Sequence, residues 1–416
     1  MKNIIILALL LSLCCCKEVR AQIVNQLLFS KTNGVYAMWD GTLVKTMGYS
    51  TTLSANIDLP SPTLVYNQGD SVKLTLWNKS QGAPHTIHLH GLDVDQQNDG
   101  VPQLSFTVHH DEKKDYHFVA PHAGTYIYHC HVVSTVHVQG GMYGMIIVRP
   151  TNGSTTQTWD NGYTYDQDMA WMMSEVDTTW HHDTIINHTH DTSQTTHTLP
   201  TNYTPQYFLV NGKSEQQLSG AGLAVNANVN EKIYLRLANI GYYGNRIVLP
   251  SALNTKIISS DGRPLPNLEQ SDTVMLFPGE RYGLLLEATG AITDSIQIEY
   301  FDLNTQAIQN TQNVPVQISG TVAVAELSNE QPSISCSVWP NPANTQVHLN
   351  VALLQSELLN GELLDINGRM VHQFSTFLAK GNTSLTLPIT ELGTGVYFLK
   401  LKTSAEQLVK KLIVEH

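Results

Sequence analysis

Hydrophobic and polar positions alternate over short stretches of this chain, as they do in half-buried β-strands. Residues 72–77 (Val-Lys-Leu-Thr-Leu-Trp) follow this period of two, and residues 145–148 (Met-Ile-Ile-Val) form the continuous apolar run of a buried strand. Turn-forming Gly, Pro, Asn and Asp residues separate such stretches. The pattern predicts an all-β protein, with a Greek-key β-sandwich of two packed sheets from Leu59 to about Pro150.

The same pattern divides the chain of 416 residues, a length that favours two to four domains. We predict a first β-sandwich domain over 22–150 and a linker rich in Thr, Asn and Gly over 151–166. A second domain follows over 167–326, with strand-like segments such as 232–239. The sequence motifs then differ from those of the two preceding domains, and residues 327–416 are predicted to form a small all-β module.

Residues 1–21 have the features of a secretory signal peptide. Lys2 provides the positive start, residues 4–13 the apolar run, and residues 19–21 (Val-Arg-Ala) a cleavage site. The apolar run is too short for a permanent membrane helix. Residues 14–16 are cysteines and raise the alternative of a lipoprotein, but Leu13 before them favours ordinary cleavage. We therefore predict an exported protein.

The composition narrows the partners and the role of the cysteines. With a net charge of -12, a nucleic-acid partner is not expected.

Removing the signal leaves Cys130 and Cys336, which in an oxidising compartment would ordinarily form a disulfide. Cys130, however, stands between His129 and His131. We therefore interpret it as a metal thiolate, with the Cys130–Cys336 disulfide as the alternative.

One set of residues has the chemistry of a blue-copper site, which uses two imidazoles, one thiolate and a weak axial thioether. His85, Cys130, His137 and Met142 provide these groups, the last three with the spacing Cys-x6-His-x4-Met. Met145 competes with Met142 as the axial ligand, and the spacing favours Met142.

A second set consists of two His-x-His pairs. Because residues two apart in a strand point to the same face, each pair projects two imidazoles together, while Cys130 points the opposite way. The second set is His88, His90, His129 and His131.

These motifs resemble those of the multicopper oxidases (laccases and bilirubin-oxidase-like enzymes) and, more distantly, of copper nitrite reductases. The resemblance covers about 35–325 and rests on residues 88–92 (His-Leu-His-Gly-Leu), 99–103 (Asp-Gly-Val-Pro-Gln), 124–129 (Gly-Thr-Tyr-Ile-Tyr-His) and 141–144 (Gly-Met-Tyr-Gly). It implies two cupredoxin-like domains. The second is similar to the middle domain of laccases and has no recognisable copper motif.

The resemblance also implies a function. The second set would be half of a trinuclear oxygen-reducing cluster, which eight histidines hold in that family, and Asp99 would be a candidate proton donor. An Asp in an Asp-Gly turn is the alternative for Asp99. The expected protein is a copper oxidoreductase that passes electrons from a small-molecule or metal-ion donor through a type 1 copper to dioxygen.

Two other functions remain open. Copper nitrite reductases generally keep an Asp between the first blue-copper His and the next copper His, whereas this chain has Thr86 and Ile87, which counts against nitrite reduction. A non-enzymatic blue-copper electron carrier or copper-binding protein would use only the first set.

The second domain shows no His-x-His-Gly and no His-Cys-His, so one chain provides four of the eight cluster histidines. Two first domains facing each other across a two-fold axis would complete the cluster. A neighbouring chain could instead donate histidines from 181–197, a segment that is equally consistent with a solvated loop. The site could also hold fewer coppers. We favour a homo-oligomer. The histidines of that segment are His181, His182, His188, His190 and His197.

The C-terminal module resembles the C-terminal sorting domain of the type IX secretion system of Bacteroidota. Residues 338–343 (Val-Trp-Pro-Asn-Pro-Ala) and 393–398 (Gly-Thr-Gly-Val-Tyr-Phe) carry this resemblance. It implies contact with the outer-membrane secretion machinery of a Gram-negative bacterium, and a mature protein that is released or held at the cell surface. An adhesion-like β-sandwich is the alternative.

Overall fold

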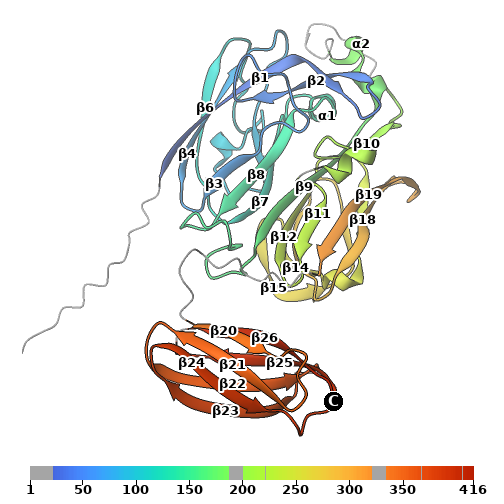
Figure 1. The fold of residues 1–416 in the computed structure, drawn as a ribbon. Helices are drawn as coiled ribbons and strands as arrows, with labels where there is room; N and C mark the ends of the chain where they lie inside the picture. Colours follow the sequence, from blue (N-terminus) through green and yellow to red (C-terminus); the bar gives the residue numbers. More distant parts are fainter. Residues whose placement is uncertain (1–21, 187–199, 221, 321–333, 367, 405) are drawn as a thin grey trace, which may run out of the picture. The chain divides into compact units, whose positions relative to one another are not determined.

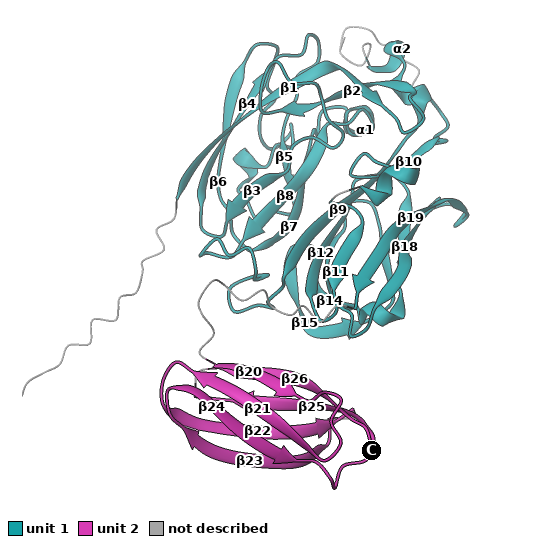
Figure 2. Ribbon diagram, in the orientation of Figure 1, with its two compact units in different colours: residues 1–323 teal, residues 324–416 magenta. Residues whose placement is uncertain are grey.

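The computed structural model describes residues 22–186, 200–220, 222–320, 334–366, 368–404 and 406–416. The chain forms two compact units, residues 1–323 and 324–416 (Figure 2). The predicted signal peptide, the boundary at 326–327, and His188, His190 and His197 lie outside the described residues. No helix in the described ranges is long and apolar enough to cross a membrane.

The first β-sandwich packs two four-stranded sheets, with strand orders β2-β1-β4-β6 and β3-β8-β7-β5 (Figure 1). The alternation in the sequence explains the packing, because Val72, Leu74 and Leu76 of β4 are buried and the residues between them are more exposed. These strands are β1 (Ile23–Ala37), β2 (Leu43–Ser50), β3 (Leu64–Asn67), β4 (Ser71–Asn78), β5 (His88–His90), β6 (Lys113–Val119), β7 (Gly124–His129) and β8 (Tyr143–Arg149).

Two short helices lie beside the strand ends that carry the histidine motifs. The 3-10 helix η1 (Gln96–Asn98) follows β5, and α1 (Ser134–Gln139) lies between β7 and β8. Val133 precedes α1 in the left-handed conformation, with φ of 42°. The chain thus turns sharply after Cys130 and brings His137 of α1 back toward it.

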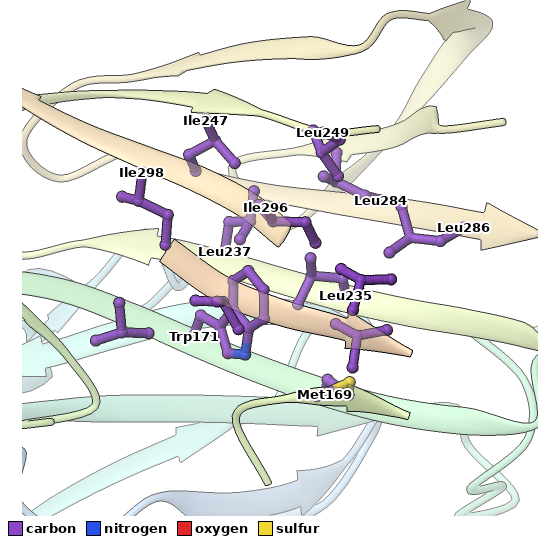
Figure 3. Packing of buried hydrophobic residues seen from close by; sticks show 14 of the residues in the cluster. Met169, Trp171, Leu235, Leu237, Ile247, Leu249, Leu284, Leu286, Ile296 and Ile298 are labelled. Carbon is purple, nitrogen blue, oxygen red and sulfur yellow. The ribbon is translucent and has the colours of Figure 1, made fainter. Parts of the chain in front are cut away.

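The second β-sandwich has sheets of six and five strands, ordered β10-β9-β12-β17-β14-β15 and β11-β19-β18-β13-β16. Its core is a cluster of buried apolar side chains around Trp171, Leu235 and Ile298 (Figure 3). The strands are β9 (Gln167–Val176), β10 (Tyr207–Val210), β11 (Val225–Asn228), β12 (Lys232–Asn239), β13 (Gly244–Val248), β14 (Lys256–Ser260), β15 (Arg263–Gln270), β16 (Thr273–Leu276), β17 (Arg281–Glu287), β18 (Ile292–Phe301) and β19 (Ile308–Ser319). The helices are η2 (Thr178–His181), α2 (Asp183–Ile186), η4 (Glu215–Ser219) and η5 (Ser251–Leu253).

The two sandwiches of the first unit share an apolar cluster, to which Ile127 and Met145 contribute from one side and Met172 and Leu209 from the other. A partly buried ion pair also contributes to this interface. Arg236 of β12 is fully buried, its Nε lies 2.7 Å from Asp168 Oδ1, and its Nη1 donates to Thr125 Oγ1 of β7 at 3.2 Å. Apolar packing and a satisfied buried charge therefore join the two domains.

The C-terminal unit is a separate small sandwich, with sheets β20-β21-β24 and β23-β22-β25-β26. Its strands are β20 (Ile334–Trp339), β21 (Gln346–Leu353), β22 (Glu357–Asp365), β23 (Met370–Leu378), β24 (Gly381–Pro388), β25 (Gly395–Lys402) and β26 (Gln407–Val414). The predicted all-β fold class is confirmed. The alternative of a disulfide is wrong, because Cys130 and Cys336 are both buried free thiols.

Candidate metal centres

The first set converges in the core of the first sandwich. Cys130 Sγ lies 3.2 Å from Nδ1 of His137 and 3.7 Å from Nδ1 of His85. All three residues are fully buried. His85 is held in place by two backbone hydrogen bonds with Val108, and Cys130 directly follows β7. Two imidazole nitrogens and one sulfur thus face a common point, as a metal ion requires.

The position of Met142 favours it over Met145 as the axial ligand. Its backbone N–H donates to the His137 carbonyl at 2.9 Å, and its carbonyl accepts from the Cys130 N–H at 3.0 Å. It is fully buried in the same apolar cluster as Cys130. Met145 packs instead in the cluster between the two sandwiches. The assignment of Met142 stays a prediction, since its placement is consistent with ligation but does not test it.

The chemistry of this donor set fits copper. Burial raises the pKa of the Cys130 thiol, so the metal-free pocket holds a neutral thiol. A bound metal ion would displace the thiol proton and neutralise the charge of the thiolate. A soft thiolate with two imidazoles in an apolar pocket is a ligand set that suits copper.

The second set forms on the other side of Cys130. Strand β5 pairs with β7 so that His88 lies opposite His129. Leu89, between the two histidines of β5, is fully buried in the core and points away from them. Ligand nitrogens of His88, His90 and His129 lie within 4.8 Å of one another. The His131 ring centroid is 5.3 Å from that of His88. All four predicted histidines therefore come together.

Backbone carbonyls orient two of these rings. Nδ1 of His88 lies 2.8 Å from the Asp99 carbonyl oxygen, and Nδ1 of His129 lies 3.0 Å from the Cys130 carbonyl oxygen. Since a carbonyl only accepts, each Nδ1 must carry the hydrogen, which leaves the Nε2 lone pair for a metal. Burial lowers the pKa of His129 to about 3 and that of His90 to about 4. Both rings are neutral at pH 7, the form that binds metal.

Asp99 lies at the edge of the second set. One of its carboxylate oxygens, Oδ1, is 3.4 Å from His88 Nδ1, and its side chain is 24% exposed. Gly100 follows with φ of 78°, and a Cβ there would overlap the Ile87 carbonyl oxygen. The Asp-Gly turn is thus tightly packed, so a role in the turn and a role beside the histidines are both compatible with this position. Proton donation by Asp99 stays a prediction.

His181 does not join either set. It is buried, and its Nδ1 lies 2.5 Å from the Lys45 carbonyl oxygen. His182 is exposed at the end of η2. Within the described residues, both groups of three metal-ligand side chains belong to the first domain.

One neighbour of the second set, Arg281, was not predicted as a site residue from the sequence. Arg281 of the second domain is 5% exposed, and its guanidinium lies beside His90, where its charge contributes to the lowered pKa of that ring. Its motif, residues 277–282 (Phe-Pro-Gly-Glu-Arg-Tyr), marks a strand turn and resembles no metal motif. Only the packing of the two domains brings it to the site.

Two family models described as "Multicopper oxidase" match residues 37–153 and 176–317, which together make up more than half of the chain. A model described as "Secretion system C-terminal sorting domain" matches residues 337–415.

Among curated proteins, L-ascorbate oxidase of Cucumis sativus is 28% identical over 183 residues, which are 43% of this chain and 28% of that protein. Laccase 1 of Metarhizium majus is 36% identical over 107 residues, 25% of this chain and 17% of that protein. Copper-containing nitrite reductase of Alcaligenes xylosoxydans xylosoxydans is 28% identical over 205 residues, 47% of this chain and 57% of that protein. The chain thus spans less than two thirds of each of these relatives.

Solved structures show the same fold. The blue copper oxidase from Nitrosomonas europaea superimposes with a TM-score of 0.55 at 23% identity, covering 72% of this chain and 86% of that one. The copper nitrite reductase from the same organism gives 0.53 at 17% identity, covering 72% and 94%. With its two family domains, its cupredoxin-like fold and its copper-type ligand sets, the chain belongs to the multicopper oxidases, a family of copper-binding oxidoreductases, and carries a C-terminal secretion sorting domain.

Proposed function

We propose that this protein takes single electrons at a type 1 copper and passes them to dioxygen at a second copper site. His85, Cys130, His137 and Met142 would hold the first copper, and His88, His90, His129 and His131 the second. The observation that carries the proposal is the His129-Cys130-His131 segment, where Cys130 belongs to one set and both its neighbours to the other. The two sets are therefore joined by single peptide links.

The side chains of the first set suit electron transfer. Bound copper supplies one-electron redox chemistry to this set. The protein keeps water out by burying all three of the strong ligands, and it fixes Cys130 through the backbone bond to Met142. A ligand set that is held rigidly in an apolar core changes little between two oxidation states, so electrons move with little rearrangement.

The second set suits exchange of a small molecule. The His88 side chain is 18% exposed, so this set reaches solvent. Asp99, beside His88, would deliver protons as dioxygen is reduced. One chain supplies four histidines, and we propose that a homo-oligomer completes the site. Two facing first domains, or histidines of 181–197 from a neighbouring chain, would do so. In the third arrangement, the second site would hold fewer coppers than the three of a trinuclear cluster.

The partners follow from this function. The electron donor would be a small molecule or a metal ion. The sorting domain supports export by a secretion system. We propose that the signal in residues 1–21 directs the first step, and that the mature protein crosses the outer membrane and is released or held at the surface.

Nitrite reduction is the second candidate, because a copper-containing nitrite reductase is among the relatives and the chain spans more of it than of the oxidases named above. Thr86 and Ile87 between His85 and His88, and His131 after Cys130, favour the oxidase. The third candidate function is that of a blue-copper electron carrier that lacks the second copper.

Copper content of the copper-loaded mature protein, with consumption of oxygen and of nitrite, tests the proposal. We expect about two or more coppers per chain and oxygen consumption in the presence of a one-electron donor. About two and a half coppers per chain would favour paired first domains that share one three-copper cluster. About one copper per chain would overturn the oxidase in favour of a carrier. Nitrite consumption without oxygen consumption would support the reductase.

A further inference from the structure

A turn of the second domain forms one wall of the second histidine set. Residues 277–280 connect β16 to β17, and Gly279 of this turn lies against His90. A Cβ added to Gly279 would be 3.1 Å from Cε1 and 3.3 Å from Nε2 of His90. Gly279 also has φ of 87°, a conformation that glycine adopts readily. The backbone of the second domain therefore packs directly on the imidazole of a candidate copper ligand.

Arg281 holds this turn in place. Its Nη1 donates to the Gly279 carbonyl at 2.6 Å and lies 2.9 Å from Asp261 Oδ1. Its Nε points to the Thr125 carbonyl of the first domain at 3.5 Å. The Arg281 side chain itself is 5% exposed, although its partner Asp261 lies at the surface with 52% of its side chain exposed. The guanidinium links two turns of the second domain to strand β7 of the first.

The same guanidinium packs on the backbone next to His90. Gly91 has φ of 85°, and a Cβ on it would overlap Arg281 Nη2. His90 is therefore confined twice, by Gly279 against its ring and by Arg281 against the residue that follows it. A guanidinium has five N–H donors and no acceptor, so Arg281 cannot itself bind copper.

We propose that Arg281 is a positioning residue for the second copper site: it clamps the Gly279 turn and Gly91 around His90 and so fixes this imidazole for metal binding. The inference rests on the proposed function, since it requires that the second set binds copper. The His90 side of the site is closed by the chain's own second domain.

Copper titration of the full-length metal-free protein tests this assignment, with copper content and the blue absorption of the first site as separate readouts. In R281M we expect the second-site affinity to fall roughly 10- to 100-fold, as for other groups that orient metal ligands, with the blue absorption unchanged. R281K keeps the charge but loses the planar fork, so it should restore little of the affinity. G279A keeps Arg281 and crowds the ring, and should show the same selective loss.

R246M is the matched control. Arg246 forms an exposed ion pair with Glu299 in the same domain, so this variant should leave both sites unchanged. Wild-type second-site affinity in R281M would overturn the inference, as would parallel loss of both sites with a lower unfolding temperature of the metal-free protein, since that indicates a general folding role. If the wild-type protein itself binds only the first copper, the proposed function fails and the inference fails with it.

Discussion

The two ligand sets of the first domain share one tripeptide and yet differ in almost every physical respect. The first set is fully buried, its ligands come from one domain, and its nitrogens face a thiol. The second set reaches solvent through His88, and a turn of the other domain forms part of its wall. A closed site suits electron transfer without exchange of ligands, whereas an open one can admit a substrate. The end of one strand can therefore provide ligands to a closed site and to an open site, because its alternate residues face opposite ways.

Removal of the thiolate should have the largest effect and should separate the two sets completely. C130S replaces a soft sulfur ligand with a hard oxygen, so we expect complete loss of the blue absorption and of turnover. Copper at the second set should remain, which copper analysis will show. C336S is the control, because Cys336 is also a buried free thiol but lies in the sorting domain. A C130S protein that stays blue would contradict the assignment.

Removal of His88 should impair the second set and leave the first set intact. In H88A we expect oxygen consumption to fall by more than about 100-fold, since changes in residues that only orient ligands already cost 10- to 100-fold. The blue absorption should persist, and a donor should still bleach it in the absence of oxygen. H348A, which removes a half-buried histidine on β21 of the sorting domain, is the matched control. Loss of the blue colour in H88A would show that the two sets are not separable.

Substitution of Met142, the proposed axial ligand, tests the composition of the first set. M142L should raise the reduction potential of the first copper by more than about 59 mV, a tenfold change in a one-electron equilibrium, because the weak thioether ligand is lost. M145L changes a methionine in the cluster between the domains, so it should cost less than about 1.5 kcal/mol of stability and leave the potential unchanged. A redox titration of both variants decides which methionine is the ligand.

Gln139, two residues after His137 of the first set, bonds to the backbone of the second domain beside a buried carboxyl, that of Glu175. Gln139 of α1 donates to the Glu175 carbonyl oxygen at 3.1 Å and accepts from the Asp177 N–H at 2.8 Å. The Glu175 carboxyl accepts hydrogen bonds from the Tyr203 hydroxyl and the Tyr243 N–H, and burial raises its pKa to about 7. The folded protein therefore holds this proton more tightly than the unfolded chain does.

The free energy of unfolding of the metal-free protein should then fall as pH rises from about 4.5 to about 7, by on the order of 3 kcal/mol from this group. E175Q cannot ionise, so the decline should be smaller by that amount. Denaturant unfolding of both proteins at the two pH values measures it. Identical pH profiles would show that Glu175 does not carry the effect.

The smallest effect is expected from the sorting domain. Residues 324–416 form a compact unit with its own apolar core. A chain that ends at residue 323 should bind the same number of coppers and have the same blue absorption as the full-length protein. A lower copper content would show that the first unit depends on the second.

The sequence was sufficient to predict those site residues whose arrangement depends on spacing within a single strand. The His-x-His spacing and the strand alternation placed His88, His90, His129 and His131 on one face because the strand period is two. Arg281 escaped prediction because its contact with the site depends on how two domains pack, and its motif carries no metal chemistry. His181 stood among candidate ligands by composition, but the fold turns its Nδ1 to the Lys45 carbonyl. The spacing alone favoured Met142 over Met145, and the packing adds support. Met142 lies in the core of the first sandwich with Cys130, whereas Met145 lies in the cluster between the two sandwiches.

The pairing of β7 has a consequence for which sequence changes this protein can tolerate. His129 pairs with Tyr143, and Cys130 follows at once, so the register of one strand end decides which side chains face the core. A single-residue insertion or deletion before Cys130 would turn the sulfur toward the histidines and two imidazoles into the apolar interior. Both proposed copper sites would be lost in one step. This strand end therefore accepts substitutions far more readily than changes of length.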